Sequence, residues 1–415
     1  MSEVENIPKH WQVKKLGEIG EIVSGGTPST KVTEYWNGNI SWISPADLSG
    51  YKEKIILKGR KSISDSGLKN SSSRLMPKGS VLFSSRAPIG YVVIAGNEVC
   101  TNQGFKSIIP NKSIFSDYLF YFLKASKQEA EKVASGTTFK EISLKAFSQL
   151  EIPVPPFSEQ EAIVSKIEEL LSDLDNGKQQ LQIAQQQLKV YRQSLLKWAF
   201  EGKLTNKIVN EGEVPKGWKQ VKIEDIATVG TGATPLKGNR EYYEDGKIAW
   251  VTSGSLNDEY VKEATEYVTD VALKETNLSI YPKNTLLLAM YGEGKTRGKC
   301  SELQIEACTN QAIAAIHFKN HDSRVKPFLK YFLLKNYNDI RRLSSGGVQP
   351  NLNLGIVKRT LFPFPPFEEQ QLIVSELESK LTVCDKIEET ISQSLLQAET
   401  LRQSILKKAF EGKLV

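Results

Sequence analysis

Apolar and polar residues alternate in the pattern of a long amphipathic helix at two places in the chain. In residues 153–204 the apolar positions recur at steps of four and three, which is the spacing of a heptad seam. The predicted seam is Ile163, Ile167, Leu170, Leu174, Leu181, Leu188, Tyr191 and Leu195, with Gly177 as its one interruption. Residues 363–414 repeat the pattern less regularly, through Ile373, Leu377, Leu381, Ile387, Ile391, Leu401 and Ile405.

The two segments are copies of one another. Both open with P-x-P-P-F and close with A-F-E-G-K-L, and a constant offset of 210 residues separates them. Proline cannot lie inside a helix, so each helix is predicted to begin just after its phenylalanine, and Gly202 and Gly412 are placed to end it. Each helix would span about 42 residues, on the order of 60 Å. The heptad phase is the same on both sides of Gly177, which favours one continuous helix there.

A helix of this length with a single apolar stripe needs a partner. The other copy is the obvious one, and antiparallel pairing would place the two preceding segments at opposite ends of a rod. Pairing between two molecules in a parallel dimer is the alternative.

The segments that precede the two helices are diverged copies as well. Trp11 corresponds to Trp218, and the run C-T-N-Q occurs twice, at 100–103 and at 308–311. Further matches join 8–28 to 215–235, 38–44 to 246–252 and 117–124 to 327–334. Short β-type runs alternate with Gly, Pro and Asn turns, and one helical run follows near the end of each segment. The pattern predicts two mixed α/β globules of one fold, hence an α+β or mixed fold class.

Composition fits a polyanion-binding protein of two or three domains. The 415 residues carry a net charge of +6, but the repeated helical segments hold −1 and −3, so the globular segments hold +10. No signal pattern or membrane-spanning run is present. The four cysteines, Cys100, Cys300, Cys308 and Cys384, are scattered, which fits reduced thiols and a cytoplasmic location.

The order of motifs resembles a known family. A unit with P-x-x-W, a G-G-T-P-S-type loop, a G-x-I-x-W strand, S-G, P-x-P-P-F-x-E-Q and a long helix ending A-F-x-G-x-L occurs twice. This arrangement resembles the specificity subunit of type I restriction–modification systems over nearly the whole chain. The resemblance implies target recognition domains at 1–152 and 205–362, and conserved spacer helices at 153–204 and 363–415.

The resemblance also implies a function without catalysis or cofactor. The two domains would each read half of an asymmetric, bipartite site in double-stranded DNA, and the antiparallel helical rod would set the gap. The subunit would dock two adenine-methyltransferase subunits and, in the full complex, ATP-dependent restriction subunits that translocate DNA.

Polar loop residues are the candidates for reading bases, because Arg and Lys donate to guanine and Asn and Gln bridge adenine. The candidates of the first domain are Thr27, Ser29, Lys31, Ser44, Arg86, Thr137 and Lys140. Those of the second domain are Thr234, Lys237, Arg240, Ser253, Lys295, Arg297, Gln349 and Asn351.

Three motifs suggest other chemistry. Residues 289–296 fit a permissive phosphate-loop pattern, but no helix is predicted after them, so a DNA-facing basic loop is favoured for Lys295, Arg297 and Lys299. Cys300, Cys308, His317 and His321 lack the short spacing of zinc knuckles. The two P-P-F runs lack the preceding Asn, Asp or Ser of adenine methyltransferases.

Three classes of function stay open at this point. The favoured class is a DNA-specificity subunit. A coiled-coil adaptor that joins proteins, and an ATP-dependent enzyme that uses residues 289–296, are the other two.

Overall fold

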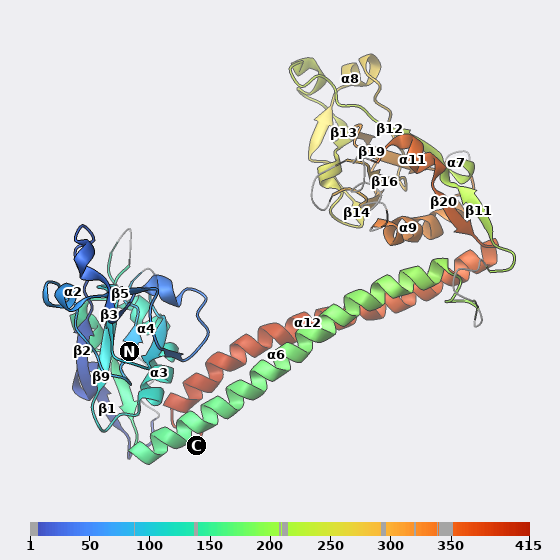
Figure 1. Cartoon of the computed structure of the whole chain (residues 1–415). Helices are drawn as coiled ribbons and strands as arrows, with labels where there is room; N and C mark the ends of the chain where they lie inside the picture. The colour runs from blue at the N-terminus through green and yellow to red at the C-terminus, as the bar shows by residue number, and fades with distance from the viewer. Residues whose placement is uncertain are drawn as a thin grey trace. The chain divides into compact units, whose positions relative to one another are not determined.

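The computed structural model describes residues 7–86, 88–136, 140–206, 209, 215–291, 296–318, 321–337, 339 and 352–415. The chain forms two compact units, shown in Figure 1. The first unit is Met1–Gln182 with Ser392–Val415, and the second unit is Ile183–Ile391. Each unit contains a globular α/β part and portions of two long helices, so the mixed α/β prediction is confirmed.

Three sheets build the globular part of the first unit. Their strand orders are β2-β9-β6-β7-β4, β5-β3-β8 and β1-β10. The pairs β4–β7 and β3–β8 are parallel, and the other pairs are antiparallel. The strands are β1 (Gln12–Lys15), β2 (Gly20–Ser24), β3 (Trp36–Ile43), β4 (Ile55–Ile56), β5 (Lys61–Ile63), β6 (Val81–Phe83), β7 (Val92–Ala95), β8 (Val99–Thr101), β9 (Lys106–Pro110) and β10 (Glu151–Val154).

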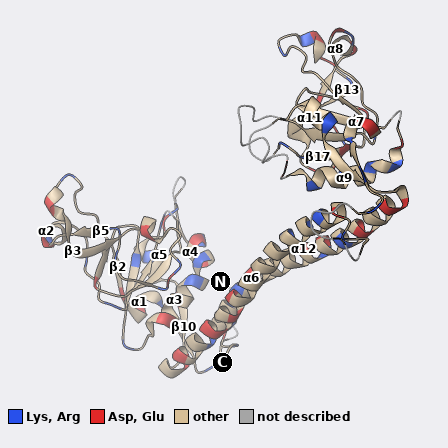
Figure 2. Ribbon diagram, turned by 45° about the vertical axis from the view of Figure 1, so that its right-hand side comes forward, with Lys and Arg blue, Asp and Glu red and all other residues tan. Residues whose placement is uncertain are grey.

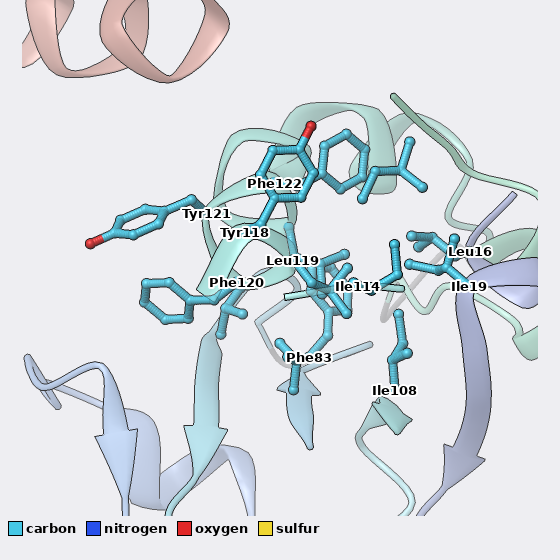
Figure 3. Packing of buried hydrophobic residues seen from close by; sticks show 14 of the residues in the cluster. Leu16, Ile19, Phe83, Ile108, Ile114, Tyr118, Leu119, Phe120, Tyr121 and Phe122 are labelled. Atoms are coloured by element: carbon cyan, nitrogen blue, oxygen red, sulfur yellow. The ribbon is translucent and has the colours of Figure 1, made fainter. Parts of the chain in front are cut away.

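The helices of this part are α1 (Leu16–Ile19), α2 (Asp65–Lys69), α3 (Ser116–Ala125), α4 (Lys127–Lys132) and α5 (Leu144–Ser148). Residues Tyr118 to Leu123 of α3 are all buried, so this helix is apolar on every side. Figure 3 shows α3 above Phe83 and Ile108, which come from β6 and β9. On its other side the ring of Tyr118 lies 5.2 Å from that of Phe410. The helix therefore joins the sheet to a long helix.

The second unit repeats this topology strand for strand. Its sheets are β12-β19-β16-β17-β14, β15-β13-β18 and β11-β20. The strands are β11 (Lys219–Lys222), β12 (Thr228–Thr231), β13 (Ile248–Val251), β14 (Tyr260–Val261), β15 (Glu266–Val268), β16 (Leu286–Ala289), β17 (Cys300–Leu303), β18 (Cys308–Thr309), β19 (Ile313–His317) and β20 (Leu361–Phe364).

Its short helices are α7 (Ile223–Ile226), α8 (Asp270–Glu275), α9 (Lys326–Lys335) and α11 (Leu354–Arg359). Here α9 takes the place of α3. The ring of Phe328 in α9 lies 4.9 Å from Phe200, the residue that corresponds to Phe410. The duplication seen in the sequence is thus a duplication of the fold and of its packing.

The two repeated segments form α6 (Phe157–Phe200) and α12 (Phe367–Phe410), each a single helix of 44 residues. Each begins at its phenylalanine, one residue earlier than predicted, and α6 continues through Gly177 as predicted. Gly202 follows α6 with φ of 75°, and the backbone N of Lys203 donates to the carbonyl of Trp198 at 2.9 Å. This bond closes the helix in the glycine-dependent way expected of the motif. No described helix has the length and apolar composition needed to cross a membrane.

Ion pairs in the first unit show that the two long helices run antiparallel. In the first unit Arg402 of α12 contacts Asp175 of α6, and Lys178 contacts Glu399. In the second unit Arg192 of α6 lies 2.5 Å from Asp385 of α12. In the first unit, the residue numbers of the paired positions rise along α6, from Asp175 to Lys178, and fall along α12, from Arg402 to Glu399. The predicted antiparallel pairing of the two helices within one chain is therefore confirmed. Lys, Arg, Asp and Glu occur along both helices (Figure 2).

The predicted seam holds at most of its positions and is wrong at three of them. Ile167, Leu188 and Leu195 are buried, as are Ile163, Ile373, Leu377, Ile391 and Ile405. Leu170, Leu174, Leu181 and Leu381 are half-buried. Tyr191, Ile387 and Leu401, by contrast, are exposed, by 42%, 43% and 50%.

At each of these three positions the next residue turns inward instead. These residues are Arg192, Glu388 and Arg402, and all three are half-buried. Their charges are accommodated because each has an ion-pair partner across the helix pair, as in the 3.1 Å contact between Arg192 and Glu388. At these positions an apolar residue stands beside a charged one, and apolar character alone does not reveal that the charged residue is paired across the helices.

Each globular part is tied to the first turn of a long helix through a tryptophan. The indole Nε1 of Trp11 donates to Glu159 of α6 at 2.9 Å, and Trp218 donates to Glu369 of α12 at the same distance. A carboxylate in the first helical turn is also favoured by the helix dipole. The repeated tryptophan is therefore a structural anchor.

Candidate nucleic-acid interface

A loop after β2 in the first unit is hydrogen-bonded to the turn after β8. The Oγ1 of Thr27 donates to Oε1 of Gln103 at 2.5 Å. The backbone N of Gly26 donates to the carbonyl of Thr101 at 2.8 Å, and its own carbonyl accepts from Nε1 of Trp42 at 2.8 Å. Three hydrogen bonds thus fix the loop that presents Thr27.

The same turn is linked to the segment that carries Arg86. The backbone N of Ser85 donates to the carbonyl of Gly104 at 2.7 Å, and Arg86 bridges Glu141 through its backbone. The structure therefore places Thr27 and Arg86 on adjoining segments, although 59 positions separate them in the sequence.

The Arg86 side chain is half-buried and already paired. Its Nη1 lies 3.1 Å from Oε2 of Glu141, and the other oxygen of Glu141 lies 3.4 Å from Nζ of Lys106. Lys140, the residue before Glu141, is exposed. A guanidinium has five N–H donors, so the bond to Glu141 orients Arg86 and leaves other donors for a second acceptor.

The other predicted residues of the first unit lie nearby or on exposed loop. Ser44 caps a short helical turn, since its backbone N and Oγ donate to Asp47 at 2.8 and 2.7 Å. It follows Ile43, whose carbonyl accepts from Asn102 at 2.9 Å in the same turn that carries Gln103. Ser29 and Lys31 are exposed.

The second unit builds the same arrangement from the corresponding residues. The Oγ1 of Thr234 donates to Oε1 of Gln311 at 2.5 Å, and Nε1 of Trp250 donates to the carbonyl of Ala233 at 3.1 Å. Thr234 and Gln311 correspond to Thr27 and Gln103. The threonine–glutamine hydrogen bond is thus repeated in the structure as well as in the sequence, with the same length of 2.5 Å in both units.

The remaining predicted residues of the second unit differ in exposure. Lys237 and Arg240 are exposed, whereas Ser253 and Arg297 are half-buried. Lys299 donates through Nζ to Oδ1 of Asn257 at 2.9 Å. Four predicted residues lie outside the described part of the chain: Thr137, Lys295, Gln349 and Asn351.

The structure adds residues that were not among the predicted set. Gln103, Gln311 and Glu141 contact predicted residues directly. The signal for the two glutamines was present in the sequence, because the run C-T-N-Q is identical in two otherwise diverged units. Glu141 carried no such signal.

A zinc site at the cysteines is contradicted by their burial and placement. Cys300 lies in β17 of the five-stranded sheet, and Cys308 lies in β18 of the three-stranded sheet. Burial raises the pKa of Cys300 to about 12 and that of Cys308 to about 11, which opposes the thiolate that binds metal. Among the described residues no group of His, Cys, Asp and Glu is arranged to hold a metal ion.

The segment with the phosphate-loop pattern connects two strands. It leads from β16 to β17, and the backbone N of Gly298 donates to the carbonyl of Ala289 at 2.9 Å. Residues 292–295 lie outside the described part of the chain. A phosphate loop requires a helix at its end, and a strand follows here instead. This connection supports the basic-loop interpretation of Arg297 and Lys299.

Comparisons with known proteins show which family the chain is similar to. A family model described as the type I restriction modification DNA specificity domain matches residues 8–185 and 215–397. The MjaIX specificity subunit of Methanocaldococcus jannaschii is 31% identical, across 100% of this chain and 95% of that protein. The EcoKI specificity subunit of Escherichia coli is 27% identical, across 76% of this chain and 69% of that protein.

Two solved structures share the fold. One is a chain from a structural study of complex assembly in the type I R-M system, with a TM-score of 0.72, 19% identity and coverage of 98% and 99% of the two chains. The other is the HsdS subunit from Thermoanaerobacter tengcongensis, with a TM-score of 0.67, 18% identity and coverage of 100% of both chains. With two copies of the family domain and a 31% identical relative matched over 95% of its length, the chain belongs to the specificity subunits of type I restriction–modification systems.

Proposed function

We propose that the chain is the non-catalytic subunit that gives a cytoplasmic type I restriction–modification complex its DNA sequence specificity. It reads an asymmetric, bipartite site, with one half-site for each recognition domain. The proposed boundaries are 1–152 and 205–362 for the recognition domains and 153–204 and 363–415 for the spacer helices. The chain needs no cofactor of its own.

One observation carries this proposal: the two units share a scaffold but not its surface. The loop that begins with Thr27 or Thr234 is fixed by equivalent hydrogen bonds in both units. Beyond the threonine the loops diverge, since Ser29 corresponds to Leu236 and Lys31 to Gly238. A common scaffold with different side chains suits two modules that bind the same polymer and read different bases.

The helix pair is proposed as the ruler of the gap between half-sites. α6 and α12 are continuous and of equal length, and antiparallel ion pairs fix their register. A seven-residue insertion would lengthen a helix by about 10 Å, which is about three base pairs of DNA. Seven residues also preserve the phase of the seam.

The exposed faces of these helices are the proposed docking surface for partners. Tyr191 and Trp198 are 42% and 39% exposed, and their rings meet edge to face at 6.5 Å. On α12 the exposed apolar residues are Leu372, Val383, Ile387, Leu396 and Leu401. Exposed apolar patches are typical of protein interfaces. The proposed partners are two adenine-methyltransferase subunits and, in the full complex, ATP-dependent restriction subunits that translocate DNA.

The direct test is sequencing of methylated adenine in a methylation-free host. The host expresses this chain with its methyltransferase, or the methyltransferase alone. A split, asymmetric motif that requires both proteins is the expected result. A soluble complex that leaves no motif would contradict the proposal and favour a protein adaptor, for which the apolar helix faces would suffice.

Two variants refine this test. Arg86→Ala should weaken recognition of one half-site only, whereas an unchanged motif and affinity would remove Arg86 from the readers. Matched seven-residue insertions after Gln182 and after Ile391 should widen the gap by about three base pairs. Methylation retained at the original gap would refute the ruler.

A further inference from the structure

The run C-T-N-Q is identical in both units, and its glutamine is the one residue of the four that is exposed. Cys100 and Thr101 in β8 are fully buried, as are Cys308 and Thr309 in β18. Identical residues at these positions follow from the shared core. The cysteine therefore needs no functional explanation, and the threonine is a core position whose Oγ1 has no hydrogen-bond partner among the described residues.

The asparagine shapes the turn. Oδ1 of Asn102 accepts from the backbone N of Gly104 at 2.9 Å, and Oδ1 of Asn310 accepts from that of Ala312 at 3.2 Å. A side-chain oxygen that accepts from a backbone N–H two residues later is the usual role of asparagine in a turn. This residue is explained by local structure.

The glutamine is different because it is exposed. Gln103 and Gln311 both face solvent, and each accepts through Oε1 from a threonine hydroxyl at 2.5 Å. Within the described residues, neither amide nitrogen donates a hydrogen bond to the protein. Each unit therefore presents an amide group that is held in place by its oxygen and has two N–H donors available.

We propose that Gln103 and Gln311 each donate these N–H groups to a DNA phosphate, with Thr27 and Thr234 as positioning residues. This contact rests on the proposed function. The two units are proposed to read half-sites of different sequence, so a side chain common to both has no shared base sequence to read. Phosphates, by contrast, are present in every half-site. The neighbouring candidate Lys31 corresponds instead to Gly238 in the second unit. A donor that is identical in both is thus assigned to the backbone of the DNA.

The proposal separates two kinds of contact within one loop. The diverged residues read sequence, while the threonine–glutamine pair sets the register of each domain on its half-site. A neutral amide releases no counterion, so the contact contributes affinity without adding to the salt dependence of binding.

The discriminating variant is Gln103→Glu in the full-length chain, assembled with its methyltransferase. A glutamate keeps the shape and still accepts from Thr27, but it has no N–H donor and would repel a phosphate. Binding to a duplex with the mapped motif should weaken by about tenfold or more. Specific and nonspecific duplexes should weaken together. Gln149→Glu, at an exposed glutamine beside α5, controls for the added charge.

Phosphate ethylation interference provides the second measurement, with Gln103→Ala. The wild-type complex should lose binding when one particular phosphate of the first half-site is ethylated, and the variant should be insensitive there. Its salt slope should equal that of the wild type. Gln311→Ala should show the same change in the other half-site.

The outcomes distinguish this contact from the proposed function. Suppose the wild-type complex binds and methylates its motif and the Gln103→Glu complex binds with equal affinity. That result would overturn the phosphate contact alone, and the Thr27–Gln103 pair would then only stabilise the loop. A change confined to one base of the motif would also overturn it. Failure of the wild-type complex to bind DNA would overturn the proposed function and this contact with it.

Discussion

Nζ of Lys330 in α9 lies 3.1 Å from Oε2 of Glu302 in β17, and the two residues are only 7% and 6% exposed. Glu259 accepts a second hydrogen bond from Lys330 at 2.7 Å. At the corresponding positions of the first unit the chain has Phe120 and Ile94, both buried in its apolar core. One fold thus accommodates an ion pair in one copy and an apolar pair in the other.

We predict that Glu302→Ile destabilises the second unit by about 3 kcal/mol, because it leaves the ammonium of Lys330 buried with fewer partners. The double variant with Lys330→Phe should recover most of the loss, since it reproduces the pair of the first unit. Hydrogen exchange of peptides from β16 and β17 measures the effect locally. Glu259→Ala, which removes the exposed partner, should cost less than about 1 kcal/mol. A double variant no more stable than Glu302→Ile would contradict this account.

The ion pair also predicts a dependence on pH. Burial raises the pKa of the Glu302 carboxyl, but hydrogen bonds and charge from Lys326 and Lys330 outweigh it and hold the pKa below its ordinary value of 4.5. Its contribution is therefore complete above the unfolded-state pKa and is lost as pH falls through the lower folded-state value. Urea midpoints at pH 6, 5, 4 and 3 should fall more steeply for the wild type than for the double variant. Parallel curves would show that Glu302 keeps its ordinary pKa.

The revised seam of α6 predicts unequal costs for two neighbouring apolar residues. Leu195 is 1% exposed and Tyr191 is 42% exposed. Leu195→Ala should cost about 2 to 5 kcal/mol, while Tyr191→Ala should change the unfolding free energy by about 0.5 kcal/mol or less. Urea unfolding of the free chain compares the two. Equal costs would restore the seam predicted from the sequence. Loss of methyltransferase binding in stable Tyr191→Ala would add support for the proposed docking surface.

Two glycines of the first repeat should respond oppositely to alanine. A Cβ built on Gly177, inside α6, would meet no atom within 4 Å apart from the adjoining helix backbone, so Gly177→Ala should stabilise the helix by about 1 kcal/mol. Gly202 has φ of 75°, and a Cβ there would lie 2.3 Å from Cγ of Pro215. Gly202→Ala should therefore destabilise by about 1 kcal/mol or more. Thermal melts followed by circular dichroism give both signs, and a stabilising Gly202→Ala would contradict the observed helix end.

Much of the candidate interface could not be found from the sequence, for a physical reason. Thr27, Gln103 and Arg86 become neighbours through hydrogen bonds between loops, and loop pairing leaves no periodic signal. The sequence pointed to Thr27 and Arg86 only through loop position and resemblance. The pairing of Arg86 with Glu141 required coordinates, because nothing in the spacing of the two residues indicates it.

By itself, the sequence determined the duplication, the mixed α/β class and the two continuous helices with their glycine ends. These features follow from local periodicity and from residues such as Pro156 and Gly202, whose backbone preferences act wherever they occur. The tertiary structure decided the antiparallel pairing and the rotation that turns Arg192 inward and Tyr191 outward. It also decided which loop residues meet. Those outcomes depend on which side chains form ion pairs and hydrogen bonds with residues distant in the sequence. Such contacts exist only after the chain has packed, so local sequence patterns do not reveal them.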